Sequence, residues 1–388
     1  MDLSLSDEQR LLQDSVARFF GREYAFDKRR AILELPERFS PAIWRTMAEL
    51  GWLGLPLPEA EGGSGGGAVE DALVMEQLGK GLVLEPYATT VLLCGGLLAA
   101  AGSPEQCGAW LPRIAAGEVR MALAYAEPGV AHEAGPEKTT ALRTDQRWRL
   151  DGAKRWVVDA PGADQFIVSA RNETSGQDQG AAALLFLVPR DAPGLRLAPF
   201  EMVDGRLAAH LAFDSVELPD SARLAGSQGD MREAIDLALD RLTAATCAEA
   251  VGCMQVLLAQ TVAYANTRVQ FGQPIAMNQA LRHRMVDMSV QCEEARAIAL
   301  RATLYLSRPA DERARAVAGA KIKVARAARV VSEGAIQIHG AMGVTEELNV
   351  GAYVKRLLAF EMSFGTPADC QRRLVALRAR AGGPRAFA

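Results

Sequence analysis

The sequence is poor in metal-binding residues and has no cysteine pairing motif. Its four histidines lie far apart and show no metal-ligand spacing. Its six cysteines include no CxxC pair, and several fall within helical apolar patterns. Such cysteines are typical of buried thiols in a reducing compartment. We therefore expect neither a metal site nor a disulfide framework.

The sequence also lacks a basic block, a secretory leader and a membrane-spanning run. The formal net charge is −4, and no cluster of Lys and Arg stands out, which argues against a nucleic-acid partner. The first residues have neither the basic nor the apolar segment of a signal peptide. The most apolar long stretch, residues 91–102, is too short and too rich in Gly and Ala to span a bilayer. We expect a soluble cytoplasmic protein that binds no membrane.

The pattern of apolar and turn-forming residues changes twice along the 388-residue chain. Residues 1–118 show helical apolar spacing and begin with a capping-box pattern at Ser6 and Gln9. Residues 119–228 contain short apolar strands separated by Gly, Pro and Asp, which favours an antiparallel sheet or barrel over βαβ units. Residues 229–388 return to long helices. The order predicts an α+β protein with an N-terminal α-helical domain, a middle antiparallel β domain and a C-terminal four-helix-bundle domain.

A compact turn interrupts the helical pattern of the last domain at residues 264–275. Arg268 offers a planar cation suited to a phosphate, and Phe271 offers an apolar face to a flat ligand. Gly272 and Pro274 end the helix, so that these groups face outward. An ordinary helix corner with one surface arginine has the same pattern. The helices expected in this domain cover residues 231–265, 279–307, 310–340 and 367–381.

Five segments, in order along the chain, resemble motifs of the acyl-CoA dehydrogenase family. They are 125–129 (YAEPG), 150–158 (LDGAKRWVV), 213–219 (FDSVELP), 264–279 (YANTRVQFGQPIAMNQ) and 337–343 (QIHGAMG). The resemblance implies an acyl-CoA dehydrogenase-like fold with FAD as cofactor. It also implies α,β-dehydrogenation of an acyl-CoA thioester, with the hydride passing to flavin N5 and the electrons leaving to an electron-transfer flavoprotein.

Within the family, the sequence is most similar to small subunits of pimeloyl-CoA dehydrogenase-type enzymes. This likeness rests on residues 82–87 and 247–252 and on the pair Asp240-Arg241. That likeness suggests a dicarboxylyl-CoA substrate. It also suggests an α2β2 heteromer with a paralogous subunit, beside the homodimer or homotetramer that the family otherwise implies.

The resemblance also implies the flavin contacts, which we carry over position by position. Ala126 and Val158 stand where the family has hydroxyl side chains, so two hydrogen bonds to the flavin would be missing. Arg268 is expected at the pyrophosphate of a neighbouring subunit's FAD. The cofactor-binding residues implied in this way are Leu123, Tyr125, Ala126, His132, Trp156, Val158, Arg268, Gln270, Phe271, Gln279, Gln337, Gly340, Ala341 and Thr366.

Several of these residues also have an ordinary structural interpretation. Trp156 could be a core residue, and His132 a solvated loop histidine. Gln337 could be a polar residue at the end of a helix. Thr366 is placed to cap the last helix, with Pro367 at its first position.

The catalytic base is the point at which the sequence departs from the family. Phe364 stands where many members carry the Glu of an E-G-T motif, and Phe cannot accept a proton. A minority of members place a Glu on the long helix before an Arg, which corresponds here to Asp240. Arg232, Asp236 and Asp240 also form a row at i,i+4 spacing that is typical of a solvated face. Glu361 is a weaker candidate.

Two functions stay open on these residues. In the first, the chain is an FAD-dependent dehydrogenase with Asp240 as base, in a site that Val158 and Phe364 make apolar enough to raise a nearby carboxylate's pKa. In the second, it is a non-catalytic subunit that completes the active site of a paralogue. A flavin monooxygenase on the same scaffold is a distant third.

Overall fold

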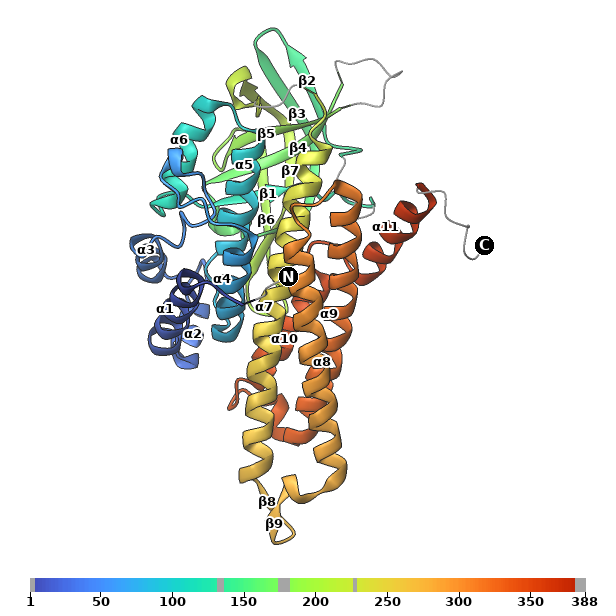
Figure 1. The fold of residues 1–388 in the computed structure, drawn as a ribbon. Helices are drawn as coiled ribbons and strands as arrows, with labels where there is room; N and C mark the ends of the chain where they lie inside the picture. The colour runs from blue at the N-terminus through green and yellow to red at the C-terminus, as the bar shows by residue number, and fades with distance from the viewer. Residues whose placement is uncertain (1–3, 131–135, 174–181, 226–228, 381–388) are drawn as a thin grey trace. The chain divides into compact units, whose positions relative to one another are not determined.

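The computed structural model describes residues 4–130, 136–173, 182–225 and 229–380, and its contacts divide the chain into two compact units. We call Met1–Ala31, Ala68–Val83 and Thr243–Ala388 the helical unit, and Ile32–Gly67 and Leu84–Leu242 the sheet unit. Figure 1 shows the ribbon of both.

The sheet unit is built on one seven-stranded sheet with the strand order β1-β4-β2-β3-β7-β6, in which β5 pairs with β4. The pairs β2/β3, β3/β7, β4/β5 and β6/β7 are antiparallel, which confirms the predicted β domain, and β4 adds parallel pairings with β1 and β2. The strands are β1 (Met121–Ala124), β2 (Thr140–Thr144), β3 (Arg147–Val158), β4 (Gln165–Asn172), β5 (Ala183–Pro189), β6 (Leu195–Glu201) and β7 (Leu207–Pro219).

An apolar core lies against this sheet. Phe166 and Val168 of β4 are opposite Val188 and Phe186 of β5, and all four side chains are buried. The ring of Trp148 meets the edge of Phe186 with centroids 5.3 Å apart. Burial of these large side chains, each worth roughly 1.5–3 kcal/mol, makes the sheet a firm support for the loops at its edges.

Short helices complete the sheet unit, and one of them departs from the prediction. Residues 1–118 are predicted as helical, and within them the segment 87–101 begins as a π-helix, Tyr87–Gly95, and continues as α5 (Gly96–Ala101). The Thr90 hydroxyl donates to the Met121 carbonyl and accepts from the Met121 N–H, each at 3.1 Å, which ties the π-helix to β1. Apolar periodicity does not reveal this wider winding. The other α-helices here are α3 (Pro41–Glu49) and α6 (Pro104–Ala115).

The helical unit contains the long helices of the C-terminal region and two from the N-terminal region. The predicted capping box is present: Ser6 N–H donates to Gln9 Oε1 at 3.0 Å, and Gln9 N–H donates to Ser6 Oγ at 3.1 Å. The helices are α1 (Asp7–Glu23), α4 (Ala68–Gly81), α8 (Gln279–Leu304), α9 (Ala310–His339), α10 (Val350–Met362) and α11 (Pro367–Arg380); α2 (Phe26–Leu33) and α7 (Arg232–Thr267) extend across the boundary between the units.

Helix α10 was absent from the prediction, and polar contacts fix it to the end of α4. The Tyr353 hydroxyl donates to the Lys80 carbonyl at 2.5 Å, and Arg356 donates to the Val83 carbonyl at 2.7 Å. Arg356 also pairs with Glu249 of α7 at 3.2 Å, and both side chains are largely buried. These contacts anchor the helix that leads into Phe364.

Helices α4 and α7 approach each other closely because two glycines face across the contact. A Cβ at Gly79 would lie 2.1 Å from the Glu249 carbonyl oxygen, and one at Gly252 would lie 2.0 Å from the Glu76 carbonyl oxygen. Both obstacles are backbone atoms, which cannot rotate away. Glycine is required at both positions by this packing.

Helix α7 is long and apolar enough to cross a membrane by length and composition, but 78% of its most apolar window is buried inside the protein. The central helix of a folded domain has the same composition. Its apolar surface is therefore accounted for by packing.

Gly79→Ala should destabilise the protein by about 1–3 kcal/mol, because the methyl group would force the two helix backbones apart. Gly319→Ala in α9 is the matched control, since a Cβ there meets nothing within 4 Å. It should be neutral or stabilising by up to roughly 1 kcal/mol through helix propensity. Urea denaturation of both variants measures the difference, and equal midpoints would contradict the close-packing argument.

Candidate functional site

The first predicted flavin-contact segment follows β1 and is held by a buried ion pair. Lys154 Nζ lies 2.8 Å from Glu127 Oε1, and the two side chains are 0% and 1% exposed. Lys154 Nζ also donates to the Tyr125 carbonyl at 3.1 Å and to Ser169 Oγ at 3.0 Å. The pair therefore joins the loop after β1 to the middle of β3.

The carboxylate of Glu127 is also held by backbone donors. It accepts N–H groups of Glu137, Lys138 and Thr139 at 2.9, 2.7 and 2.9 Å. Burial acts to raise the pKa of Glu127, but Lys154 and these donors outweigh it and lower the pKa to about 2. Burial lowers the pKa of Lys154 against the attraction of Glu127. Both groups are charged at neutral pH, and each provides the counter-charge for the other.

At the end of β1 and in the loop that follows it, the side chains of the predicted contact residues are buried. Leu123, Tyr125 and Ala126 are all buried, and Arg155 N–H donates to the Ala126 carbonyl at 2.8 Å. Val158, at the end of β3, is buried as well. The predicted contact segments 123–126 and 156–158 are thus brought together within one unit. Contact with a flavin through backbone groups, as the resemblance implies, fits this arrangement.

Trp156 is the exposed aromatic group of this region. Its backbone lies in the left-handed region, with φ +56°, at a register shift between β3 and β7. The side chain is 56% exposed, so its interpretation as a core residue is wrong. Its ring meets the edges of Phe200 and His210 at 5.1 and 5.9 Å, and the backbone N–H of Trp156 donates to His210 Nδ1 at 3.4 Å. The bulge therefore turns an indole toward solvent, where a flat ligand can contact it.

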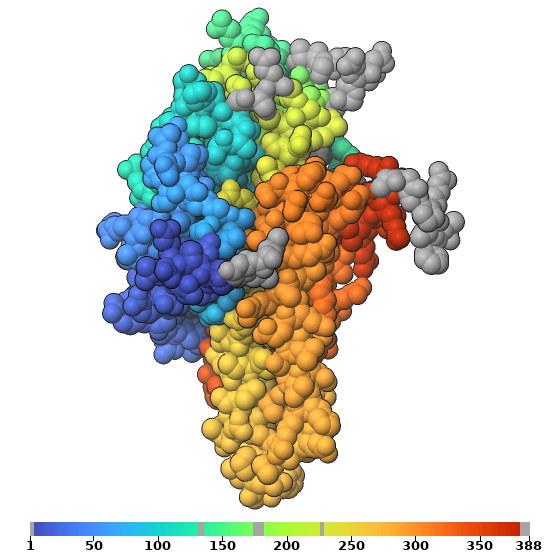
Figure 2. Space-filling model, viewed as in Figure 1, coloured from blue at the N-terminus to red at the C-terminus, as the bar shows by residue number. Residues whose placement is uncertain are grey.

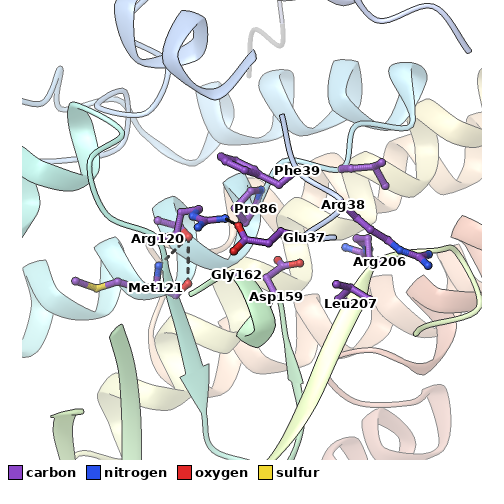
Figure 3. A pocket seen from close by; sticks show the side chains of 12 residues that line it. Glu37, Arg38, Phe39, Pro86, Arg120, Met121, Asp159, Gly162, Arg206 and Leu207 are labelled. Carbon is purple, nitrogen blue, oxygen red and sulfur yellow. Dashed lines mark hydrogen bonds and ion pairs between the residues drawn. The ribbon is translucent and has the colours of Figure 1, made fainter. Parts of the chain in front are cut away.

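A cleft lies in the same unit (Figure 3). Arg120 pairs with Glu37 at 2.8 Å, and its guanidinium lies over the Phe39 ring. Asp159, directly after Val158, has φ +61° and accepts the Thr89 hydroxyl at 2.5 Å. The charged residues that line the cleft are largely paired with other residues of the chain. The lining residues are Glu37, Arg38, Phe39, Leu84, Pro86, Thr90, Arg120, Met121, Asp159, Gly162, Arg206 and Leu207.

The predicted turn after α7 forms a hairpin that we call the arm (residues 268–275), at the lower end of Figures 1 and 2. It contains β8 (Val269–Gln270) and β9 (Gln273–Pro274). Arg268, Gln270 and Phe271 are exposed, Phe271 completely so. Within the described residues the Arg268 guanidinium has no hydrogen-bond or ion-pair partner. The arm thus presents a cation and an aromatic ring to solvent, and the described part of the chain offers the cation no partner.

The end of α9 lies beside the end of α7 that carries the arm. The rings of Tyr264 and His339 stack with centroids 4.4 Å apart, and His339 Nδ1 lies 2.8 Å from the Ala335 carbonyl. Gln337 and Gly340 are exposed at this end, and Gly340 has φ +60°. Ala341 and Gln279 are exposed as well. An exposed Gln337 is compatible both with a ligand contact and with a solvated helix end.

Thr366 caps α11, as the sequence suggested. Its hydroxyl accepts Asp369 N–H at 3.2 Å and donates to Asp369 Oδ2 at 2.6 Å. Two residues earlier, Phe364 is half-buried with φ +53°, a conformation that costs a bulky residue of order 1–3 kcal/mol. The surrounding turn therefore enforces a left-handed backbone at Phe364. By the resemblance, this is the position at which the family has its Glu.

The candidate bases differ in their surroundings. Asp240 is 1% exposed, so its interpretation as part of a solvated charged face is wrong. Glu361 pairs with Arg329 at 2.6 Å, which occupies its carboxylate. His132 lies outside the described residues. The sequence interpretation missed the roles of Glu127 and Lys154, although two opposite charges within apolar strand patterns were a usable signal.

Comparisons with known proteins place this architecture. Residues 6–118, 122–216 and 231–379 match the N-terminal, middle and C-terminal domains of acyl-CoA dehydrogenase. The chain is 30% identical to the probable acyl-CoA dehydrogenase YngJ of Bacillus subtilis, over 97% of this chain and 99% of that one. It is 30% identical to benzylmalonyl-CoA dehydrogenase of Aromatoleum aromaticum, over 92% and 93%.

Among solved structures, the ChsE4-ChsE5 complex of Mycobacterium tuberculosis superposes with a TM-score of 0.88 and 26% identity, over 99% of this chain and 100% of the matched chain. The fold is that of a flavin-dependent oxidoreductase with a β domain between helical domains. The chain belongs to the acyl-CoA dehydrogenase family, whose members are FAD-dependent.

Lys154→Met should destabilise the protein by about 3–5 kcal/mol, because it leaves the Glu127 carboxylate buried without its counter-charge. Arg147→Met is the control, since the Arg147–Glu217 pair is exposed at 67% and 64% and should contribute at most about 1 kcal/mol. Urea denaturation at neutral pH compares them. Similar losses in both variants would contradict the role of the buried pair.

The same pair predicts an acid limb in the stability profile. The folded-state pKa of Glu127, about 2, is below its ordinary value of 4.5, so its contribution is present above about pH 4.5 and is lost as pH falls toward 2. The free energy of unfolding should therefore fall less steeply over this range in Lys154→Met than in the wild type.

Proposed function

We propose that this chain is an acyl-CoA dehydrogenase in which Asp240 removes the α proton of the thioester. FAD, when bound, supplies the hydride acceptor. The observation that carries the proposal is the burial of Asp240 on a long apolar helix. A carboxylate is seldom placed there for solubility, and taking an acidic C–H proton requires a base shielded from water.

The residue at the family's usual base position supports this assignment. Phe364 has no proton acceptor there, so the base must be supplied by another residue. Asp is one methylene shorter than the Glu of the family, so the proposal requires the acyl group to lie nearer to α7. Because a misplacement of about 1 Å can cost on the order of 100-fold in rate, this fit determines the activity.

The cofactor-binding roles follow the same proposal. Leu123, Tyr125, Ala126, Trp156 and Val158 would contact the isoalloxazine, with Trp156 supplying the exposed ring. Arg268, whose guanidinium has no partner among the described residues, would bind the pyrophosphate in a neighbouring subunit. Gln270, Phe271, Gln279, Gln337, Gly340, Ala341, His132 and Thr366 would complete the cofactor contacts.

The substrate and partners can be proposed at the level of chemical class. Benzylmalonyl-CoA dehydrogenase, a relative, is named for a thioester with a second carboxylate. We propose a dicarboxylyl-CoA substrate, an electron-transfer flavoprotein as acceptor and a cytoplasmic location. The domain division at residues 118 and 228 belongs to the same proposal.

A second candidate is a base-less subunit that completes the site of a paralogue. The likeness to small subunits of pimeloyl-CoA dehydrogenase-type enzymes motivates it, and a similar structure is a complex of two different chains. The exposed arm serves this candidate as well as the first, because an arm that binds the FAD of a neighbour remains useful in a chain without a base. This candidate predicts flavin binding only with the paralogue.

Asp240→Asn should slow acyl-CoA-dependent bleaching of bound flavin by about 10²- to 10⁴-fold, the usual contribution of a general base. Asp236→Asn, one turn earlier on α7, is the matched control and should bleach normally. Anaerobic stopped-flow absorbance on the purified chain measures both. Bleaching that survives Asp240→Asn would exclude Asp240 as the base.

Phe364→Glu separates the two candidates. It returns a carboxylate to the position that the family uses for its base. If Asp240 is the base, this variant should bleach flavin even when combined with Asp240→Asn. If the chain serves only a paralogue, neither the wild type nor Phe364→Glu purified alone should hold flavin that acyl-CoA bleaches.

Arg268→Met should weaken FAD binding by on the order of 10- to 100-fold, because a charge-assisted contact to a phosphate is lost. The melting temperature of the FAD-free chain should not change, since the guanidinium has no partner in the described residues. Arg284→Met, an exposed arginine of α8, is the control. Fluorescence titration with FAD measures both, and equal affinities would remove Arg268 from the cofactor site.

A further inference from the structure

Lys321 is a buried cation that the proposed reaction does not use. It lies in the middle of α9 and is 1% exposed. Its ammonium donates to the carbonyl of Phe360 and, at 3.0 Å, to the carbonyl of Ser363. It also lies over the Phe360 ring, 3.8 Å from the centroid. All of these contacts are made to the last turn of α10 and the residue after it.

The carbonyls at the end of a helix lack intrahelical donors and carry its negative partial charge. Lys321 supplies two of the missing hydrogen bonds. The chain then turns through Phe364, with φ +53°, and Gly365, with φ +98°, before Thr366 begins α11. We call residues 363–366 the turn. A residue in the left-handed region persists only where its surroundings enforce it.

Carboxylates near Lys321 are engaged elsewhere. Glu361 of α10 pairs with Arg329, and Glu249 of α7 pairs with Arg356. The thiols of Cys247 on α7 and Cys370 on α11 also interact electrostatically with Lys321, and burial raises the pKa of Cys247 to about 12, so this thiol is neutral. Within the described residues the Lys321 ammonium therefore makes its direct hydrogen bonds to backbone carbonyls and forms no ion pair, although the charges of Glu361 and Glu249 act to raise its pKa.

We propose that Lys321 is a positioning residue, which fixes the turn at the position of the family base and thereby sets the Thr366 end of the cofactor site. The hydrogen bonds to Phe360 and Ser363 carry the inference, and its consequence for FAD rests on the proposed function. The ammonium is held where its charge is costly. The position of the turn consequently depends on the protonation of one buried group.

The direction of the pH dependence follows from burial. Burial lowers the pKa of Lys321 from 10.5 to about 8. When the turn opens and water reaches the amine, its pKa returns toward 10.5. Between these values the closed form holds fewer protons than the open form, so rising pH favours the closed turn. Opening should become rarer from pH 7.5 to 10.5, by at most about 300-fold, a pKa difference of 2.5 in logarithmic terms.

Hydrogen exchange of the amides at 365 and 366 in the full chain without FAD tests the proposal directly. In the wild type, protection factors corrected for intrinsic exchange should rise with pH above about 7.5. Lys321→Met should lower protection and abolish its pH dependence. Lys323→Met is the matched control, because Lys323 is on the same helix but pairs at the surface with Glu294. An unchanged pH dependence in Lys321→Met would overturn the proposal.

Two further measurements cover the case in which Lys321→Met does not fold. The ¹³Cε resonance of Lys321 in the wild type should titrate near pH 8, and titration at its ordinary value would overturn the inference. Lys321→Arg keeps the charge and the donors without titrating in this range, so protection should be retained and become pH-independent. Loss of protection in Lys321→Arg to the level of a disordered turn would count against positioning by these hydrogen bonds.

The consequence for FAD is measured separately. Fluorescence titration should show FAD binding weakened on the order of tenfold in Lys321→Met and unchanged in Lys323→Met, the loss expected for one misplaced hydrogen-bonding group. Altered exchange with unaltered FAD affinity would overturn the link to the cofactor. If the isolated wild type binds no FAD, the dehydrogenase proposal fails for the isolated chain, while the exchange experiment still decides the role of Lys321.

Discussion

The arrangement of the sheet-side cofactor segments depends on the ion pair between Glu127 and Lys154. Without it, two full charges would lie in a region that excludes water, so the pair must form whenever the sheet forms. Its formation fixes the carbonyl of Tyr125 and brings the loop after β1 against β3. Because the two buried charges must pair, the two segments that carry them, which are far apart in the sequence, are held together. Burying charge is an expensive way to obtain geometry, and it is reasonable where the geometry serves a ligand.

The helical unit shows the same principle with a different donor. There the ends of α7, α9 and α10 are held by side chains that reach backbone carbonyls or stack on each other. Tyr353 anchors α10 to α4, Arg356 anchors it to the segment that follows α4, and Lys321 holds its last turn. Helix ends offer unsatisfied carbonyls, so a buried cation at such an end is both stabilised and directional. The strained backbone at Phe364 follows directly after this anchored turn.

Much of the fold was predictable because its signals are local. The capping box at Ser6, the long apolar helices and the short punctuated strands each act over a few residues, and the motif pattern placed the chain in its family. Helix α10 was missed, and the π-helix at Tyr87 was predicted as an ordinary helix, because neither has a distinctive period. The burial of Asp240 could not be read from its i,i+4 row, because charge spacing describes a helix face and not what covers it. The exposure of Trp156 depends on a bulge in β3 that only the pairing with β7 reveals.

The exposure of the arm determines how substitutions in it would affect the abundance of the protein. Cellular quality control recognises unfolding, since chaperones and proteases act on the unfolded fraction. Phe271 is completely exposed, and Arg268 has no partner among the described residues, so neither side chain contributes measurably to the folding of its own chain. A substitution of Arg268 or Phe271 that leaves the hairpin intact would escape that surveillance, and the altered protein would accumulate at normal abundance.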